Sequence, residues 1–98
     1  MDLAAFRASL AGPAPPAGLS AALQGLWWDG RGDWARAHGC AQAADDAPSA
    51  AVHAYLHRKE GDLGNAGYWY ARAGRAPARD ALAAEWARLV QELLRGAA

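Results

Sequence analysis

Two histidines, His53 and His57, stand four residues apart at the start of the segment HAYLHRKEGDLGNAGYWYARAG, which covers residues 53–74. In an α-helix this spacing places both imidazoles on one face, and Glu60 continues that face about one turn further on. Two imidazoles one turn apart can bind the same divalent metal ion, and a histidine that titrates near neutrality can act as a general acid or base. The third histidine, His38, could join either kind of site from the preceding hairpin.

The sequence leaves three interpretations of these histidines open. In the first they are structural, and each imidazole is bonded to a backbone carbonyl, to Asn65, to Glu60 or to a tyrosine hydroxyl, as buried polar groups usually are. In the second they bind a divalent metal ion, and the candidate ligands are His38, His53, His57 and Glu60. In the third, His53, His57 and Glu60 are the catalytic candidates of a pocket for acid–base chemistry.

Two kinds of enzyme are not expected. A zinc-protease motif needs a glutamate directly after its first histidine, and Ala54 stands at that position. A covalent mechanism lacks a suitable nucleophile, because Cys40 lies in an alanine-rich segment and the only hydroxyl groups outside the tyrosines belong to Ser9, Ser20 and Ser49. Apart from a divalent metal ion, no cofactor is expected.

Three consecutive aromatic residues, Tyr68, Trp69 and Tyr70, follow the histidines. Neighbouring positions on a helix point about 100° apart, so the three rings cannot all face one core. We expect Tyr70 to pack inward and Tyr68 to share an outer face with Arg72 and Arg75. Arginine forks suit a carboxylate or another anion, although cations at the end of a helix also complement its dipole. The predicted binding surface consists of Trp28, His38, Tyr68, Trp69, Arg72 and Arg75.

The elements that must position these side chains are predicted to be helical. Alanine and leucine dominate the 98 residues, and the only β-branched residues are Val52 and Val90, a composition typical of all-α proteins. A chain of this length forms one domain. Ten basic residues balance ten acidic ones, so we expect neither nucleic acid nor an anionic membrane as a partner.

A cytoplasmic location is expected from the single cysteine, because Cys40 has no partner for an intramolecular disulfide. Asp2 and Arg7 interrupt the apolar residues at the start of the sequence, so no signal peptide is expected there. No apolar run approaches the length that spans a bilayer.

Glycine and proline divide the predicted domain into helical segments. The dipeptide Gly32-Asp33 recurs as Gly61-Asp62; in both places the glycine can end one helix in the left-handed conformation and the aspartate can cap the next. Consecutive prolines prevent a helix from continuing through the GPAPPAG segment. We predict a single helical domain over 1–98, with an N-terminal helix at 1–11, a Pro/Gly linker at 12–18, a first hairpin at 20–45, a second hairpin at 47–75 and a C-terminal helix at 78–95.

The recurring turn belongs to a longer repeated pattern. In each copy a small residue stands seven positions before the glycine of the turn, and alanines stand five and twelve positions after it. These small residues are Gly25, Ala37 and Ala44 in the first copy and Ala54, Ala66 and Ala73 in the second. The pattern resembles the tetratricopeptide repeat and its Sel1-like relatives, in two short copies over about residues 20–78.

The resemblance to these helical-hairpin repeats implies two antiparallel hairpins with a groove for a protein or peptide. Two features depart from the tetratricopeptide pattern: the copies are closer together, and the proline that ends a repeat is displaced to Pro48 and Pro77. Residues 53–75 also resemble a small uncharacterised bacterial protein family that shares the His-x-x-x-His, Glu-Gly-Asp, Asn-Ala and Tyr-Trp-Tyr elements. We attach no activity to that family, so this second resemblance implies no mechanism.

The C-terminal segment carries an apolar stripe with helical spacing. This helix either closes the open end of the array or forms a homodimer. Glu85 with Arg88, and Glu92 with Arg95, are expected to be exposed pairs three residues apart. The stripe consists of Leu82, Trp86, Leu89, Val90, Leu93 and Leu94.

The leading hypothesis from the sequence is a small cytoplasmic helical-repeat protein that binds a protein or peptide partner through its aromatic and histidine side chains. The alternative is a small metal-binding protein or acid–base enzyme with a histidine-rich pocket. The positions of the ring nitrogens of His38, His53 and His57 relative to one another and to Glu60 bear most directly on this choice.

Overall fold

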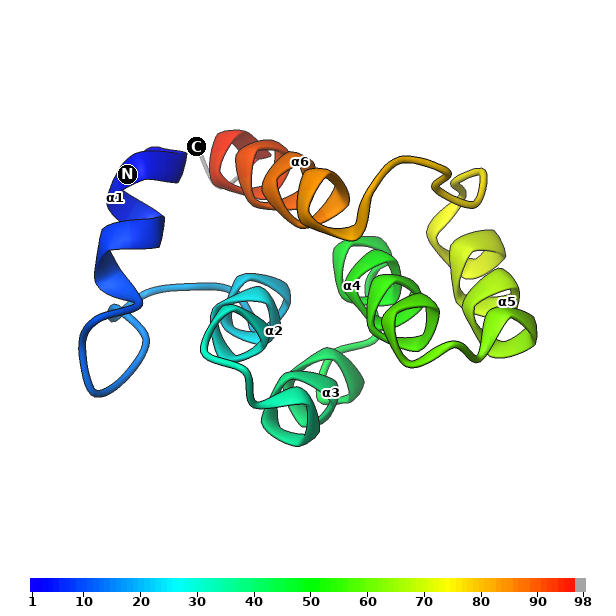
Figure 1. The fold of residues 1–98 in the computed structure, drawn as a ribbon, viewed down its shortest axis with the longest axis horizontal. Helices are drawn as coiled ribbons and strands as arrows, with labels where there is room; N and C mark the ends of the chain where they lie inside the picture. The colour runs from blue at the N-terminus through cyan, green and yellow to red at the C-terminus, as the bar shows by residue number, and fades with distance from the viewer. Residues whose placement is uncertain (97–98) are drawn as a thin grey trace.

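The computed structural model describes residues 1–96, and this part of the chain contains six α-helices and no strand (Figure 1). The all-α prediction is therefore confirmed. None of the helices in this range combines the length and the apolarity needed to cross a membrane. The helices are α1 (Leu3–Ser9), α2 (Ala21–Gly30), α3 (Trp34–Gln42), α4 (Ala47–Glu60), α5 (Leu63–Ala73) and α6 (Leu82–Gly96).

Two helical hairpins, α2–α3 and α4–α5, form the centre of the molecule. The recurring Gly-Asp dipeptides make their turns, as the sequence predicts. Gly32 and Gly61 have φ angles of 80° and 89°, a conformation that glycine adopts without the penalty a Cβ would bring. Asp33 accepts the backbone N–H of Arg36 at 3.1 Å, and Asp62 accepts that of Asn65 at 3.1 Å, so each aspartate caps the second helix of its hairpin.

The sixth helix closes the array within the chain. It packs on α2, α4 and α1, and Figure 1 shows it lying across the side of the hairpins away from α3. Its residues Trp86, Leu89 and Val90 are buried in the same core as Trp27, and the Trp86 indole donates to the Leu26 carbonyl at 2.9 Å. The central part of the predicted apolar stripe is thus used to cap the hairpins.

Small residues let α2, α3 and α4 approach closely. A Cβ added to Gly25 of α2 would lie 3.2 Å from the Ala37 carbonyl oxygen of α3 and 3.2 Å from a methyl group of Val52 in α4. Ala37 and Ala41 are buried at the same crossing. This packing matters for function because α3 and α4 carry all three histidines, and His38 and His53 directly follow Ala37 and Val52.

The predicted exposed pairs of α6 are wrong. Glu85 is 2% exposed and accepts from Arg58 at 2.8 Å and from the Tyr70 hydroxyl at 2.6 Å, whereas Arg88 pairs with Asp80. Burial, followed by the bond to Glu85, raises the pKa of Tyr70 above its usual value, so this hydroxyl keeps its proton and donates. Glu85 lies under the α4–α5 hairpin because the packing of α6 turns that face inward. The second predicted pair fails similarly, since Glu92 binds Arg75 at 2.7 Å.

Candidate metal centre

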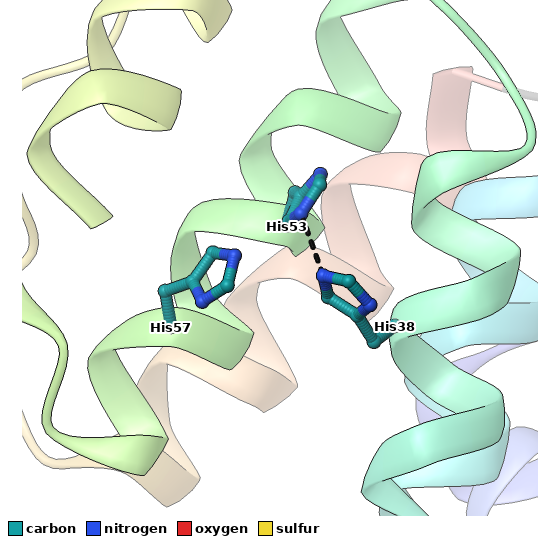
Figure 2. Close-up of side chains that lie close together, drawn as sticks. All are labelled: His38, His53 and His57. Atoms are coloured by element: carbon teal, nitrogen blue, oxygen red, sulfur yellow. Dashed lines mark hydrogen bonds between the residues drawn. The ribbon is translucent and has the colours of Figure 1, made fainter. Parts of the chain in front are cut away.

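The three histidines of the chain meet between α3 and α4 (Figure 2). His53 and His57 project from successive turns of α4, and His38 reaches them from α3. One ring nitrogen of each histidine lies within 4.8 Å of the corresponding nitrogens of the other two. The Nε2 atoms of His38 and His53 are 2.9 Å apart. We call these three residues the histidine cluster.

Two tryptophans hold the outer faces of the histidine cluster. Trp34, one helical turn before His38, stacks on it with ring centroids 4.9 Å apart and planes 9° apart. Trp69 of α5 stacks on His53 at 3.9 Å and 15°. The Trp34 indole also donates to the Leu56 carbonyl at 3.0 Å, which restrains its ring. The imidazoles therefore sit in orientations that packing determines.

Burial differs across the cluster. His53 is 3% exposed and His57 is 6% exposed, whereas His38 is half-buried. Of the three residues, His38 on α3 is therefore the one most accessible to solvent.

Hydrogen bonds define the tautomer of His57. Its Nδ1 lies 2.6 Å from a carboxylate oxygen of Glu60, and its Nε2 lies 3.3 Å from the side-chain nitrogen of Asn65. A carboxylate only accepts, so the ring proton is on Nδ1, and the Nε2 lone pair accepts from the amide. Histidines that bind metal ions commonly have this arrangement, in which a carboxylate orients the ring through its other nitrogen.

His38 and His53 are neutral at pH 7. Burial, together with the neighbouring imidazoles of His38 and His57, lowers the pKa of His53 to about 4. Burial also lowers the pKa of His38, as does the neighbouring His57. Of two neutral imidazoles joined through Nε2, one donates and the other accepts. Transfer of the shared proton to Nδ1 of its own ring would leave both Nε2 lone pairs facing the same space.

The nitrogen separations suit a metal ion after small movements. At Zn–N distances of 2.0–2.1 Å, two ligands of a tetrahedral ion are about 3.3 Å apart. The 2.9 Å separation of His38 and His53 is slightly below this value, and the 4.8 Å bound on the three nitrogens lies above it. A small increase in the separation of the His38 and His53 nitrogens, and a movement of the His57 ring toward them, would bring all three nitrogens to one ion.

Glu60 has a different place from the other three candidate ligands. Its carboxylate contacts Nδ1 of His57, and within residues 1–96 the only group of possible metal ligands that includes Glu60 is a separate one with His57 and the exposed Asp62. Within the histidine cluster Glu60 is therefore an orienting residue, while the three imidazoles are the candidate ligands.

The residues of the predicted binding surface do not lie together in the structure. Trp69 forms a wall of the histidine cluster, but Trp28 packs edge-on against Trp27, and the Arg36 guanidinium lies 4.5 Å above its ring. Tyr70, expected to pack inward, does so and bonds Glu85, so it is no wall of the cluster.

The predicted row of Tyr68, Arg72 and Arg75 does not form one site either. Tyr68 is exposed, as expected, and its hydroxyl accepts from Arg72 at 3.2 Å. Arg72 is then paired with Asp45 at 3.0 Å, and Arg75 turns to Glu92 of α6. The two arginines thus have different acidic partners, which weakens the hypothesis of a shared anion site.

Trp34 is not among the predicted site residues, although it stacks on His38. Its position could have been predicted from the spacing, because residues four apart in a helix share a face. Read from His38 backwards, that rule identifies Trp34 as the nearest large side chain on the same face of α3.

Comparison with known proteins finds no matching family model, no matching curated protein and no matching solved structure. The resemblance to helical-hairpin repeats therefore stays a prediction, and the function must be inferred from the side chains themselves.

Proposed function

We propose that this protein binds a divalent transition-metal ion, with zinc as the best-suited ion, through His38, His53 and His57. The observation that carries the proposal is the convergence of three imidazole nitrogens from two helices within 4.8 Å. Neutral imidazole suits zinc, copper, nickel and iron, and zinc sites with three protein ligands keep a fourth position for water or a substrate atom. The half-buried side at His38 supplies access for that fourth ligand.

Metal binding would exchange hydrogen bonds of the histidine cluster for ligand bonds. The Nε2 atoms of His38 and His53 share one hydrogen bond, and Nε2 of His57 accepts from the Asn65 amide. An ion at the centre would use one lone pair from each ring at once.

The pKa of His53 argues against acid–base catalysis by this residue. A general acid or base works best when its pKa is near the operating pH. Burial and the two neighbouring imidazoles lower the pKa of His53 to about 4. At neutral pH its ring is therefore unprotonated, as a metal ligand must be. The same burial that weakens it as a proton carrier keeps its lone pair available for a metal ion.

Metal analysis of tag-free protein tests the proposal. We expect one equivalent of zinc per chain after equilibration and dialysis, and a cobalt-substituted form with the visible absorption of a tetrahedral site. His38→Gln removes a ligand that is half-buried, so the chain should still fold. Arg36→Gln, an exposed change in the same helix, is the matched control. Folded wild-type protein that retains no ion, or equal retention by His38→Gln and Arg36→Gln, would refute the proposal.

A protein or peptide partner at α5 is the second candidate function. Tyr68 is 53% exposed, and α6 leaves it open because α6 packs on α1, α2 and α4. Tyrosine is enriched in the energetic centres of protein interfaces. A cytoplasmic location, which the lone Cys40 favours, belongs to the same proposal.

Light scattering and pull-down experiments address this second function. If the partner is another copy, wild-type protein should show about twice the chain mass and Tyr68→Ala the monomer mass. If it is a different protein, Tyr68→Ala should lose a partner that Arg36→Gln retains. A monomer whose captured proteins are the same in both variants would contradict the hypothesis.

A further inference from the structure

An open cavity lies on the side of α4 opposite the histidine cluster. Tyr55 and Lys59 of α4 face it, about 200° around the helix from His53 and His57. Its volume is about 480 Å³, within the range of small-molecule sites. The walls come from the first, second and sixth helices and their ends. We call this space the Asp29 cavity; its lining residues include Leu10, Asp29, Leu82, Ala83 and Trp86.

The floor of the Asp29 cavity is a buried carboxylate with two donors. Asp29 is 5% exposed; one of its oxygens accepts from the Tyr55 hydroxyl at 2.7 Å and the other from the Lys59 ammonium at 2.9 Å. Burial, then the bond to Asp29, raises the pKa of Tyr55 well above its usual value, so this hydroxyl remains a donor. Lys59 uses one of its three donors on Asp29, which leaves two.

A second cation also lines the Asp29 cavity. Arg7 of α1 is exposed, and its guanidinium carbon lies 5.8 Å from the centre of the Trp86 ring. Among residues 1–96 it forms no salt bridge with an acidic side chain. The lining thus contains two cations, Arg7 and Lys59, and one carboxylate, Asp29. Its net charge is therefore one positive charge.

The rest of the lining is apolar. Leu10, Leu82, Ala83 and the ring of Trp86 surround the charged floor. Gly30 contributes to this shape, because an added Cβ there would lie 3.0 Å from Leu10 and 3.1 Å from Trp86. Apolar walls favour an apolar ligand body. An excess cation with free donors favours a negatively charged head group.

We propose that the Asp29 cavity binds a small organic monocarboxylate with an apolar body. The carboxylate would take the donors of Arg7 and Lys59, and the body would lie against Leu10, Leu82 and Trp86. A ligand ammonium fits less well, because both oxygens of Asp29 already accept hydrogen bonds. The site is independent of the histidine cluster, so its ligand binding does not require a metal ion.

Calorimetry with octanoate as the probe, and 1-octanol as its uncharged counterpart, tests this proposal. We expect saturable binding of one octanoate per chain, and at least tenfold weaker binding of octanol. Tryptophan fluorescence provides a second readout, because Trp86 lines the cavity. Equal affinities for acid and alcohol, or the absence of saturable octanoate binding by folded protein, would overturn the proposal.

Two variants test separately the positive charge of the Asp29 cavity and its shape. Arg7→Gln should weaken octanoate binding at least fivefold and leave octanol unchanged. Ala83→Trp, at an exposed position of the lining, should block both probes without disturbing the core. Arg36→Gln removes a cation outside the cavity and should change neither affinity. Octanoate binding that survives Ala83→Trp in a protein of unchanged circular dichroism would place the ligand elsewhere and refute the assignment.

Discussion

The two polar faces of α4 differ in the kind of partner that their groups have. On one face Tyr55 and Lys59 meet the carboxylate of Asp29, and each of its oxygens accepts from a different donor. On the other face His53 shares one hydrogen bond with His38, and His57 bonds Glu60 and Asn65. The Asp29 side thus joins its donors to one carboxylate, whereas on the histidine side three ring nitrogens converge on one space that an ion could occupy.

This difference shows why burial of polar groups does not by itself identify a metal site. Glu85, like Asp29, is a buried carboxylate that a tyrosine hydroxyl and a cation of α4 satisfy. Such groups stabilise one arrangement of the helices when every member has its partner. The histidine cluster differs, because three ring nitrogens converge within 4.8 Å and the pKa values of His38 and His53 are lowered. These are the properties of a metal-ligand set.

The largest expected effect is a difference in zinc affinity between variants on the two faces of α4. His53→Gln should lower zinc affinity about a thousandfold, equivalent to about 4 kcal/mol, because it removes the most buried of the three ligands. Asp29→Ala, on the opposite face, should leave zinc affinity unchanged. Competition with a chromophoric chelator measures both. Similar affinities for the two variants would show that the ion does not bind at the histidine cluster.

Low pH should destabilise the metal-free protein because the buried His53 resists protonation in the folded state. Unfolded His53 takes up a proton near pH 6.5, whereas the folded residue does so only near its pKa of about 4. The free energy of unfolding should therefore fall by roughly 3 kcal/mol as the pH drops from 6.5 to 4, because the unfolded chain binds more protons in this range. His38 adds to the loss, since its pKa is also lowered.

Urea unfolding between pH 4 and 7 measures this dependence. His53→Gln should flatten the profile, and zinc should raise stability at pH 7 more than at pH 5, because protons compete for the ligands. The titratable groups next to His53 are His38 and His57, and the Glu60 carboxylate bonds His57. An identical slope in wild-type protein and His53→Gln would assign the pH dependence to groups outside the cluster.

Removing the carboxylate of the Asp29 cavity should cost about 2 kcal/mol of folding stability. Asp29→Ala leaves the Tyr55 hydroxyl buried without its acceptor, and an orphaned donor costs about 1–3 kcal/mol. Lys59 contributes less, because its partly exposed side chain can return to water. The double variant Asp29→Ala with Tyr55→Phe should recover part of the loss in urea unfolding. Additive losses from the two single changes would contradict the coupling.

The smallest expected effect concerns the orientation of His57. Glu60→Gln replaces an acceptor carboxylate by an amide and should lower zinc affinity about tenfold, since partners of ligating histidines typically contribute 10–100-fold. The variant should still bind one ion, which distinguishes an orienting residue from a ligand. Loss of binding as large as that of His53→Gln would make Glu60 a direct ligand.

Local features of the fold were predictable from the sequence. The turns at Gly32-Asp33 and Gly61-Asp62, the caps they provide and the outward position of Tyr68 all follow from interactions within one hairpin, and the structure confirms them. The pairs expected along α6 were wrong because the partners of Glu85 and Glu92 come from other helices. Sequence spacing identifies which residues share a face, but not which helix that face meets.

The sequence by itself determined that the chain is helical and that His53 and His57 lie on one face of α4, because helix propensity and the 3.6-residue repeat are local properties. Tertiary structure decided that His38 joins them and that Trp34 and Trp69 enclose them. Gly25 of α2 lets both α3 and α4 approach that helix closely. The Asp29 cavity also depends on tertiary packing, since four helices that are distant in sequence contribute its walls.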